Sequence, residues 1–160
     1  MDHVGLKTLE AELLADCVEA ENALVAVRAR LELGSLAGQE AAAFHLVRLY
    51  NVVEQMSLRV AKAFENHLDD ETNWHAELTR RLSIEIAGVR PPLWPASLGA
   101  SLRQLRGFRH IVTHAYDLTF DPARLALVVR DAETVVAALS PSCQAFIGRV
   151  AASLSTDSAA

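Results

Sequence analysis

The sequence has 160 residues, of which 51% are hydrophobic and 22% are charged, and its net charge is −5 at neutral pH. This apolar content excludes an intrinsically disordered chain, and the negative total argues against indiscriminate binding to nucleic acid. Aromatic residues make up only 6%, whereas Ala and Leu are abundant, and this composition favours packed helices over strands. We therefore expect an all-α fold with one domain over residues 1–154, followed by a frayed tail over residues 155–160.

The first half of the chain predicts two long helices and the start of a third. Apolar residues recur at helical spacing over residues 5–33, and Gly34 and Ser35 end that helix. A second helix is expected over residues 36–66, followed by a polar turn in which Asp69, Asp70 or Thr72 can cap the third helix. We expect the third helix to continue to Gly88.

The second half predicts an extended connection and two further helices. The Pro-rich segment at residues 91–95 cannot be helical inside, and we expect it to pack Trp94 inward. A helix over residues 96–116 follows, and Asp121 and Pro122 signal the start of the last helix. Pro141 is expected to kink or break that helix. The pattern predicts an antiparallel up-and-down four-helix bundle with an additional short helix.

Targeting and redox signals are few. Cys17 and Cys143 lie in apolar helical contexts without a metal-binding or disulfide spacing, so we expect both to be reduced, buried and structural. No secretory signal and no membrane-spanning apolar run is recognised. We therefore expect a cytoplasmic protein that does not contact a membrane.

The positive charge is concentrated in one segment. Residues 1–73 have a net charge of −7 and residues 117–160 a net charge of −2, whereas residues 74–116 have a net charge of +4. All six basic residues of that segment are arginines, whose guanidinium group suits phosphate, although a solvated helical face would show the same pattern. They are Arg80, Arg81, Arg90, Arg103, Arg106 and Arg109.

Residues 98–117 form the stretch around which we expect the site to be built. With an advance of about 100° per residue, a helix here gathers its polar side chains on one sector and its apolar ones on the opposite arc. The polar sector holds Arg103, Arg106, Arg109, His110, Thr113 and His114, and the arc expected to be buried holds Leu98, Leu105, Phe108, Ile111, Val112 and Ala115.

Within this stretch Arg109, His114 and Tyr116 form an R-x4-H-x-Y motif. The motif resembles the signature of the HepT toxin ribonucleases of the HEPN superfamily. A polar residue after the Arg, here His110, and the upstream VVEQMSLRVAKAF segment also resemble that family, and the resemblance covers roughly residues 8–150. It implies a HEPN-like bundle and a toxin of a toxin–antitoxin system.

The two motif residues have the chemistry that metal-independent RNA cleavage requires. Activation of a 2′-hydroxyl needs a base, an acid for the leaving oxygen and positive charge at the phosphate. An imidazole can exchange a proton near neutral pH, and an Arg stays charged. We therefore assign catalysis to Arg109 and His114, with His110, Arg106 and Arg103 as supporting or RNA-binding residues. Without the motif, His114 would be interpreted as a capping residue at a helix C-terminus.

The resemblance further implies partners and a mode of regulation. It implies a homodimer that joins two Arg/His pairs in one cleft that cuts RNA. It also implies an MntA-like nucleotidyltransferase antitoxin that adds AMP to the tyrosine at the position of Tyr116, a modification called AMPylation. Tyr50, the other tyrosine, lies in the apolar register of its helix, where burial would hide the hydroxyl.

Several alternatives stay open at this point. His110 and His114 could bind a metal with His75, although no HExxH motif supports this and we expect neither metal nor cofactor. Glu54 could orient the motif side chains or be an ordinary solvated or ion-paired Glu. The chain could also be a non-catalytic HEPN-type module that binds a nucleotide or a nucleotidyltransferase partner, or a helical interaction protein without site chemistry.

Overall fold

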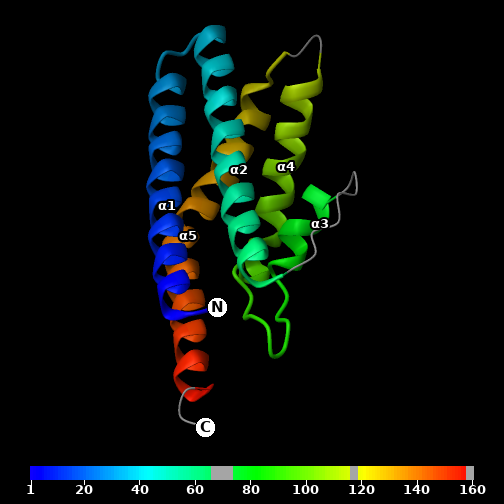
Figure 1. Ribbon diagram of the computed structural model, residues 1–160. Coiled ribbons are helices and arrows are strands. Elements are labelled where there is room, and N and C mark those ends of the chain that lie inside the picture. Colours follow the sequence, from blue (N-terminus) through cyan, green and yellow to red (C-terminus); the bar gives the residue numbers. More distant parts are fainter. Residues whose placement is uncertain (66–73, 116–118, 158–160) are drawn as a thin grey trace.

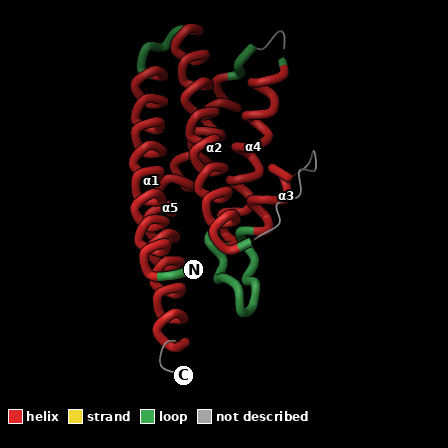
Figure 2. The backbone as a smooth tube through the Cα atoms, viewed as in Figure 1, coloured by secondary structure: helices red, strands yellow, loops and turns green. Residues whose placement is uncertain are grey.

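Four long helices run alternately up and down through the protein (Figure 1). The computed structural model describes residues 1–65, 74–115 and 119–157. In this part of the chain only helices, loops and one isolated bridge are present (Figure 2). The prediction of an all-α bundle with one additional short helix is confirmed. The helices are α1 (His3–Leu31), α2 (Leu36–Phe64), α3 (Trp74–Arg81), α4 (Gly99–His114) and α5 (Pro122–Asp157), with a 3-10 turn, η1, at Ala96–Leu98.

Local capping signals set most of the helix boundaries. The Asp2 carboxylate accepts a hydrogen bond from the Gly5 N–H at 2.7 Å, so α1 begins two residues before the predicted start. After α1, Gly34 has φ 61°, a left-handed conformation that costs Gly little and that turns the chain into α2. The predicted cap of α5 is confirmed, because the Asp121 carboxylate accepts from the Ala123 N–H at 2.9 Å. The residues predicted to cap α3 lie outside the described residues.

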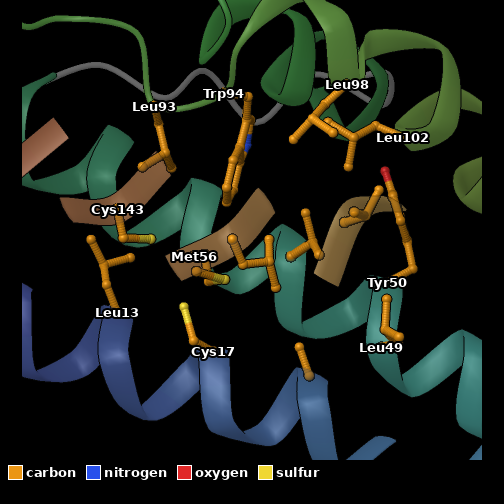
Figure 3. Close-up of a cluster of buried hydrophobic side chains, with 14 of the residues drawn as sticks. Leu13, Cys17, Leu49, Tyr50, Met56, Leu93, Trp94, Leu98, Leu102 and Cys143 are labelled. Atoms are coloured by element: carbon orange, nitrogen blue, oxygen red, sulfur yellow. The ribbon is translucent and has the colours of Figure 1, made fainter. Parts of the chain in front are cut away.

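One hydrophobic core lies between the long helices. α1 packs against α2 and α5, and α4 packs against α2 and α5. Cys17 of α1 and Cys143 of α5 are both free and buried in this core, as predicted (Figure 3). Trp94 also enters the core as predicted, with its ring fully buried and its Nε1 donating a hydrogen bond to Ser57 Oγ at 2.8 Å. This contact fixes the Pro-rich connection against α2.

The third helix is shorter than predicted. It ends at Arg81 rather than Gly88, and an antiparallel bridge joins Ile86 to Arg90 around Gly88, which has φ 73°. The side chain of Arg90 explains the early end, because its guanidinium donates to the carbonyl oxygens of Arg81 and Ile84, each at 3.1 Å. These carbonyls at the end of the helix are therefore satisfied without further helical turns.

Pro141 does not break the last helix. α5 continues through it as one element, with Leu139 and Cys143 buried on either side. A helical proline removes one backbone hydrogen bond and costs about 3 kcal/mol. Pro141 itself is exposed. Burial of the flanking side chains against the rest of the bundle offsets the cost, so tertiary packing overrides the local signal.

α5 is long and apolar enough to resemble a membrane-spanning helix, which we did not predict from the sequence. By length and composition alone, residues 122–155 could cross a membrane, and 33% of the most apolar window is buried. The buried positions include Val135, Leu139 and Val150, which form one wall of the core.

Candidate functional site

The apolar stripe of α4 leads directly to Arg109. Leu98, Leu102 and Leu105 are buried and follow one another at helical spacing, and Arg109 continues the same line one turn later. Arg109 is consequently half-buried and faces α2, whereas Ile111, which we expected to be buried, is 53% exposed. The buried face of α4 is therefore centred nearer to Arg109 than we predicted. The reason is Leu102, which is buried and lies beside the sector that holds the arginines.

Glu54 of α2 meets Arg109 at this boundary. The Arg109 guanidinium lies 3.5 Å from a Glu54 carboxylate oxygen, and the two side chains are 31% and 7% exposed. Arg109 Nε is buried and makes no hydrogen bond to any atom of the described chain. A mostly buried carboxylate beside a partly buried guanidinium restrains its orientation more than an exposed pair would. Glu54 is therefore both ion-paired and placed to orient Arg109, which combines the two interpretations left open above.

His114 is the last residue of α4 and its ring is held by the preceding turn. Its Nδ1 lies 2.9 Å from the His110 carbonyl oxygen and 2.9 Å from Thr113 Oγ1. A carbonyl oxygen only accepts, so in the neutral ring Nδ1 carries the proton and Nε2 keeps its lone pair. Because His114 is exposed, that Nε2 is available to take a proton from a bound molecule.

Two neighbours complete this arrangement at the end of α4. The His110 ring stacks on the His114 ring, with a centroid distance of 4.4 Å and an interplanar angle of 29°. Thr113 Oγ1 lies 2.8 Å from the Arg109 carbonyl oxygen, to which it donates, so it can accept from His114 Nδ1. No role was predicted for Thr113. The signal that could have indicated one is a Thr directly before a His at a helix end.

The sequence matches the model of a known protein family. Residues 41–150, which include most of α2, all of α4 and most of α5, match the family described as HepT-like protein. The chain belongs to the HepT-like family. Among curated proteins and among solved structures, no match was found. The matched range contains Glu54, Arg109 and His114.

Not every arginine of the basic segment is available in the HepT-like chain. Arg90 is 3% exposed and its guanidinium lies 2.7 Å from the Glu65 carboxylate, which Arg81 also contacts at 2.6 Å. We counted both residues among the phosphate-binding arginines, but their guanidinium groups stabilise the chain around the end of α3. Arg103 is exposed, whereas Arg106 is half-buried on the same helix.

Two predicted residues cannot be placed. Tyr116, the expected site of AMPylation, lies outside the described residues, as does the side chain of His75. Among the described residues, no three His, Cys, Asp or Glu side chains gather in a group that could hold a metal ion.

Proposed function

We propose that this HepT-like chain is the toxin of a toxin–antitoxin pair and acts as a metal-independent endoribonuclease. Arg109 would stabilise negative charge on the scissile phosphate, and His114 would transfer the proton. The observation that carries the proposal is the state of the His114 ring, whose Nδ1 contacts the His110 carbonyl oxygen at 2.9 Å and leaves Nε2 exposed. Arg109, five residues earlier, is restrained by Glu54.

The proposed reaction needs only groups that the protein and the RNA supply. His114 Nε2 takes the proton of a ribose 2′-hydroxyl, and that oxygen forms a bond to the adjacent phosphorus. The bond from phosphorus to the 5′-oxygen breaks, and that oxygen receives a proton from a general acid. Arg109 contacts the phosphate oxygens while charge develops on them. The products are a 2′,3′-cyclic phosphate and a free 5′-hydroxyl, so a substrate with 2′-O-methyl groups throughout should resist cleavage.

A second copy of the chain would supply the acid. One chain offers one Arg109–His114 pair, and a His114 that has taken the 2′-proton cannot also be the acid in the same step. We therefore propose a homodimer in which the α4 helices meet. This is supported by the outward face of α4, where Gly107 and Ile111 are exposed and a Cβ atom at Gly107 would meet nothing within 4 Å.

Silencing of the toxin would act at the same place. We propose that an MntA-like nucleotidyltransferase antitoxin adds AMP to Tyr116 in the cytoplasm. The added phosphate would carry negative charge two residues beyond His114, where it competes with RNA for Arg109. The fully buried position of Tyr50 supports Tyr116 as the acceptor, because the only other phenol of the chain lies inside the bundle, where the active site of a second enzyme cannot enclose it.

The test of this function is cleavage of single-stranded RNA by matched variants in EDTA. Arg109→Ala and His114→Ala should each lower the rate by at least about 100-fold, because each removes a group that acts on the transition state. Arg130→Ala and His3→Ala remove the same side-chain types at exposed positions elsewhere and should cleave normally. Circular dichroism should report an unchanged helical content in all four variants, and growth inhibition should follow the cleavage rates.

Three outcomes would count against the proposal. A strict requirement for a divalent ion would favour a His-based metal site, and unchanged cleavage by His114→Ala would remove the proposed base. RNA or nucleotide binding without any cleavage by the parent protein would instead support the non-catalytic HEPN-type module.

A further inference from the structure

A pocket of about 470 Å³ lies between α3 and the beginning of α4. This α3–α4 pocket has Tyr50 of α2 in its wall, and its size falls in the range of small-molecule sites. The apolar part of the wall comes from Ile84, Ala96 and Leu102. The polar part comes from Tyr50, Thr79, Arg80, Ser83, Arg103 and Arg106.

The Tyr50 hydroxyl is the unusual feature of this wall. Tyr50 is fully buried, and within the described part of the chain its Oη makes no hydrogen bond of good geometry; its nearest polar neighbour is the hydroxyl of Thr79, whose Oγ1 is buried and without a well-formed hydrogen bond there too. Figure 3 shows the Tyr50 hydroxyl directed away from α1, toward the side where Leu102 of α4 lies. A buried hydroxyl without a hydrogen-bond partner destabilises the fold, because it has lost its hydrogen bonds to water. A residue with this cost at a pocket wall suggests a ligand that supplies the missing hydrogen bond.

The charge around the pocket indicates the chemistry of that ligand. Arg80, Arg103 and Arg106 line it, and among the described residues of its wall none is acidic. Burial raises the pKa of the Tyr50 phenol, and the nearby Thr79 hydroxyl and Arg106 charge offset only part of this rise. The phenol therefore stays protonated at neutral pH and can donate as well as accept. Arginine side chains, hydroxyl groups and apolar side chains in one wall together match a phosphate joined to a nucleobase.

We propose that the α3–α4 pocket binds one nucleotide unit, with its phosphate held by Arg103 and Arg106 and its base placed against Leu102. Tyr50 and Thr79 would hydrogen-bond to the base edge or the ribose. The unit can belong to an RNA chain or to a free nucleotide such as AMP. For the RNA source, the inference rests on the proposed function and deepens it, because the pocket would select the position at which the strand is cut.

The placement of the pocket along α4 suits this role. Arg103 and Arg106 precede Arg109 by six and three residues, which is a rise of roughly 9 and 4.5 Å along the helix. An RNA strand that enters the pocket at Arg103 would therefore continue along α4 toward Arg109 and His114. The pocket is a separate binding site on the same track, and neither Glu54 nor His114 is part of its lining.

The experiment measures binding of two probes, 5′-AMP by calorimetry and a short single-stranded RNA by fluorescence anisotropy. All proteins carry His114→Ala so that the RNA stays intact. Tyr50→Phe removes the unpartnered hydroxyl alone, Arg103→Ala removes one pocket charge, and Ala96→Trp fills the space from an exposed position. Arg130→Ala, which removes an exposed charge on α5, is the control. Thermal unfolding shows whether each variant is folded.

The proposal expects all three pocket variants to bind more weakly than the control. Tyr50→Phe should weaken binding by about 3- to 10-fold, as expected for one lost hydrogen bond, and Arg103→Ala by roughly 10-fold or more. With RNA, Arg103→Ala should also reduce the slope of log affinity against log salt by about 0.7, the value for one phosphate contact to a single strand. Weakening for RNA alone identifies the strand as the source, and weakening for AMP alone identifies a free nucleotide.

Other results would overturn it. If Tyr50→Phe raises the unfolding temperature and leaves both affinities unchanged, the hydroxyl has no ligand. If Arg103→Ala and Ala96→Trp match Arg130→Ala for both probes, the pocket binds no nucleotide. Cleavage assays on proteins that retain His114 show which of the two proposals fails. Loss of cleavage with retained pocket binding would refute the nuclease, and cleavage without pocket binding would refute the nucleotide site.

Discussion

At the scale of single residues, the site includes two side chains that contact the catalytic candidates without being expected to contact the RNA. Glu54 contacts the guanidinium of Arg109, and Thr113 contacts Nδ1 of His114. Both act through another residue, so they are positioning residues whose removal should affect the rate more than the fold. Each can be tested with a conservative substitution, and the control is the same substitution at another position of the bundle.

Glu54→Gln should lower the cleavage rate and reduce stability. The neutral amide keeps the shape but no longer restrains the Arg109 charge, and we expect a loss of about 1–2 kcal/mol in unfolding free energy, below the usual cost for a fully buried pair because Arg109 is partly exposed. Urea denaturation and steady-state kinetics measure the two effects. Glu40→Gln, at an exposed position of the same helix, should change neither. A Glu54→Gln enzyme with the parent kcat would show that the carboxylate does not position Arg109.

Thr113→Val should lower kcat by several-fold while KM and helical content stay the same. The substitution removes only the hydroxyl, so His114 keeps the His110 carbonyl contact but loses the second one. Thr113→Ser should restore the rate, and the pH–rate profile should shift in Thr113→Val but not in Thr113→Ser. Thr134→Val is the control, because Thr134 Oγ1 donates to the carbonyl four residues earlier in the same way, at 2.9 Å. If Thr113→Val and Thr134→Val lower kcat equally, the loss would come from a general change in the helix and not from the contact with His114.

At the scale of elements, α4 combines two functions on opposite faces. Its inner face packs through Leu102 and Leu105, and its outer face carries Ile111, His110 and His114. The inner packing fixes how far the helix can rotate, so contact between the outer faces of two copies would bring their His114 residues together.

Ile111→Asp should convert the expected dimer to a monomer and lower cleavage in parallel. An exposed apolar side chain at the proposed contact is replaced by a charge that the two-fold related copy would repeat. Light scattering and activity are measured together across protein concentration. Leu127→Asp is the control, since Leu127 is 56% exposed on α5, compared with 53% for Ile111. A fully active monomer, of either the parent or the variant, would contradict the shared cleft.

At the scale of the whole molecule, the bundle exposes one end of α4 while it buries the phenol of Tyr50. Tyr50 of α2 lies in the wall of the pocket between α3 and α4, and under the proposed function Tyr116 is then the tyrosine that accepts AMP. Regulation would then depend on the fold as a whole, because packing decides which tyrosine an antitoxin can reach.

Tyr116→Phe should keep most of the nuclease activity but escape silencing by the nucleotidyltransferase. The hydroxyl is needed neither as base nor as acid, so only the acceptor of AMP is lost. Intact-mass spectrometry after incubation with the antitoxin and ATP should detect AMP on the parent and on Tyr50→Phe, and none on Tyr116→Phe. AMP on Tyr50, or inhibition of Tyr116→Phe equal to that of the parent, would refute this assignment.

The sequence alone determined the helical class, the bundle topology and the family, because these depend on apolar periodicity, on local caps such as Asp121 and on the spacing from Arg109 to His114. The burial of both cysteines followed from the same periodicity, and that of Trp94 was expected from the extended Pro-rich connection. Tertiary structure alone decided where α3 ends, that α5 continues through Pro141, and that Arg90 is structural. Each of these depends on side-chain packing or hydrogen bonds that the local sequence pattern does not reveal.

The site divides in the same way. The residue types on α4 could be read from their order, but the rotation of the helix could not, because Leu102 shifts its buried face by its contacts with the rest of the bundle. That rotation turns Arg109 toward Glu54, which lies 55 positions earlier in the chain. It also places Arg103 and Arg106 at a pocket whose other wall comes from α3. Contacts between segments so far apart are set by packing and are not encoded in any local pattern.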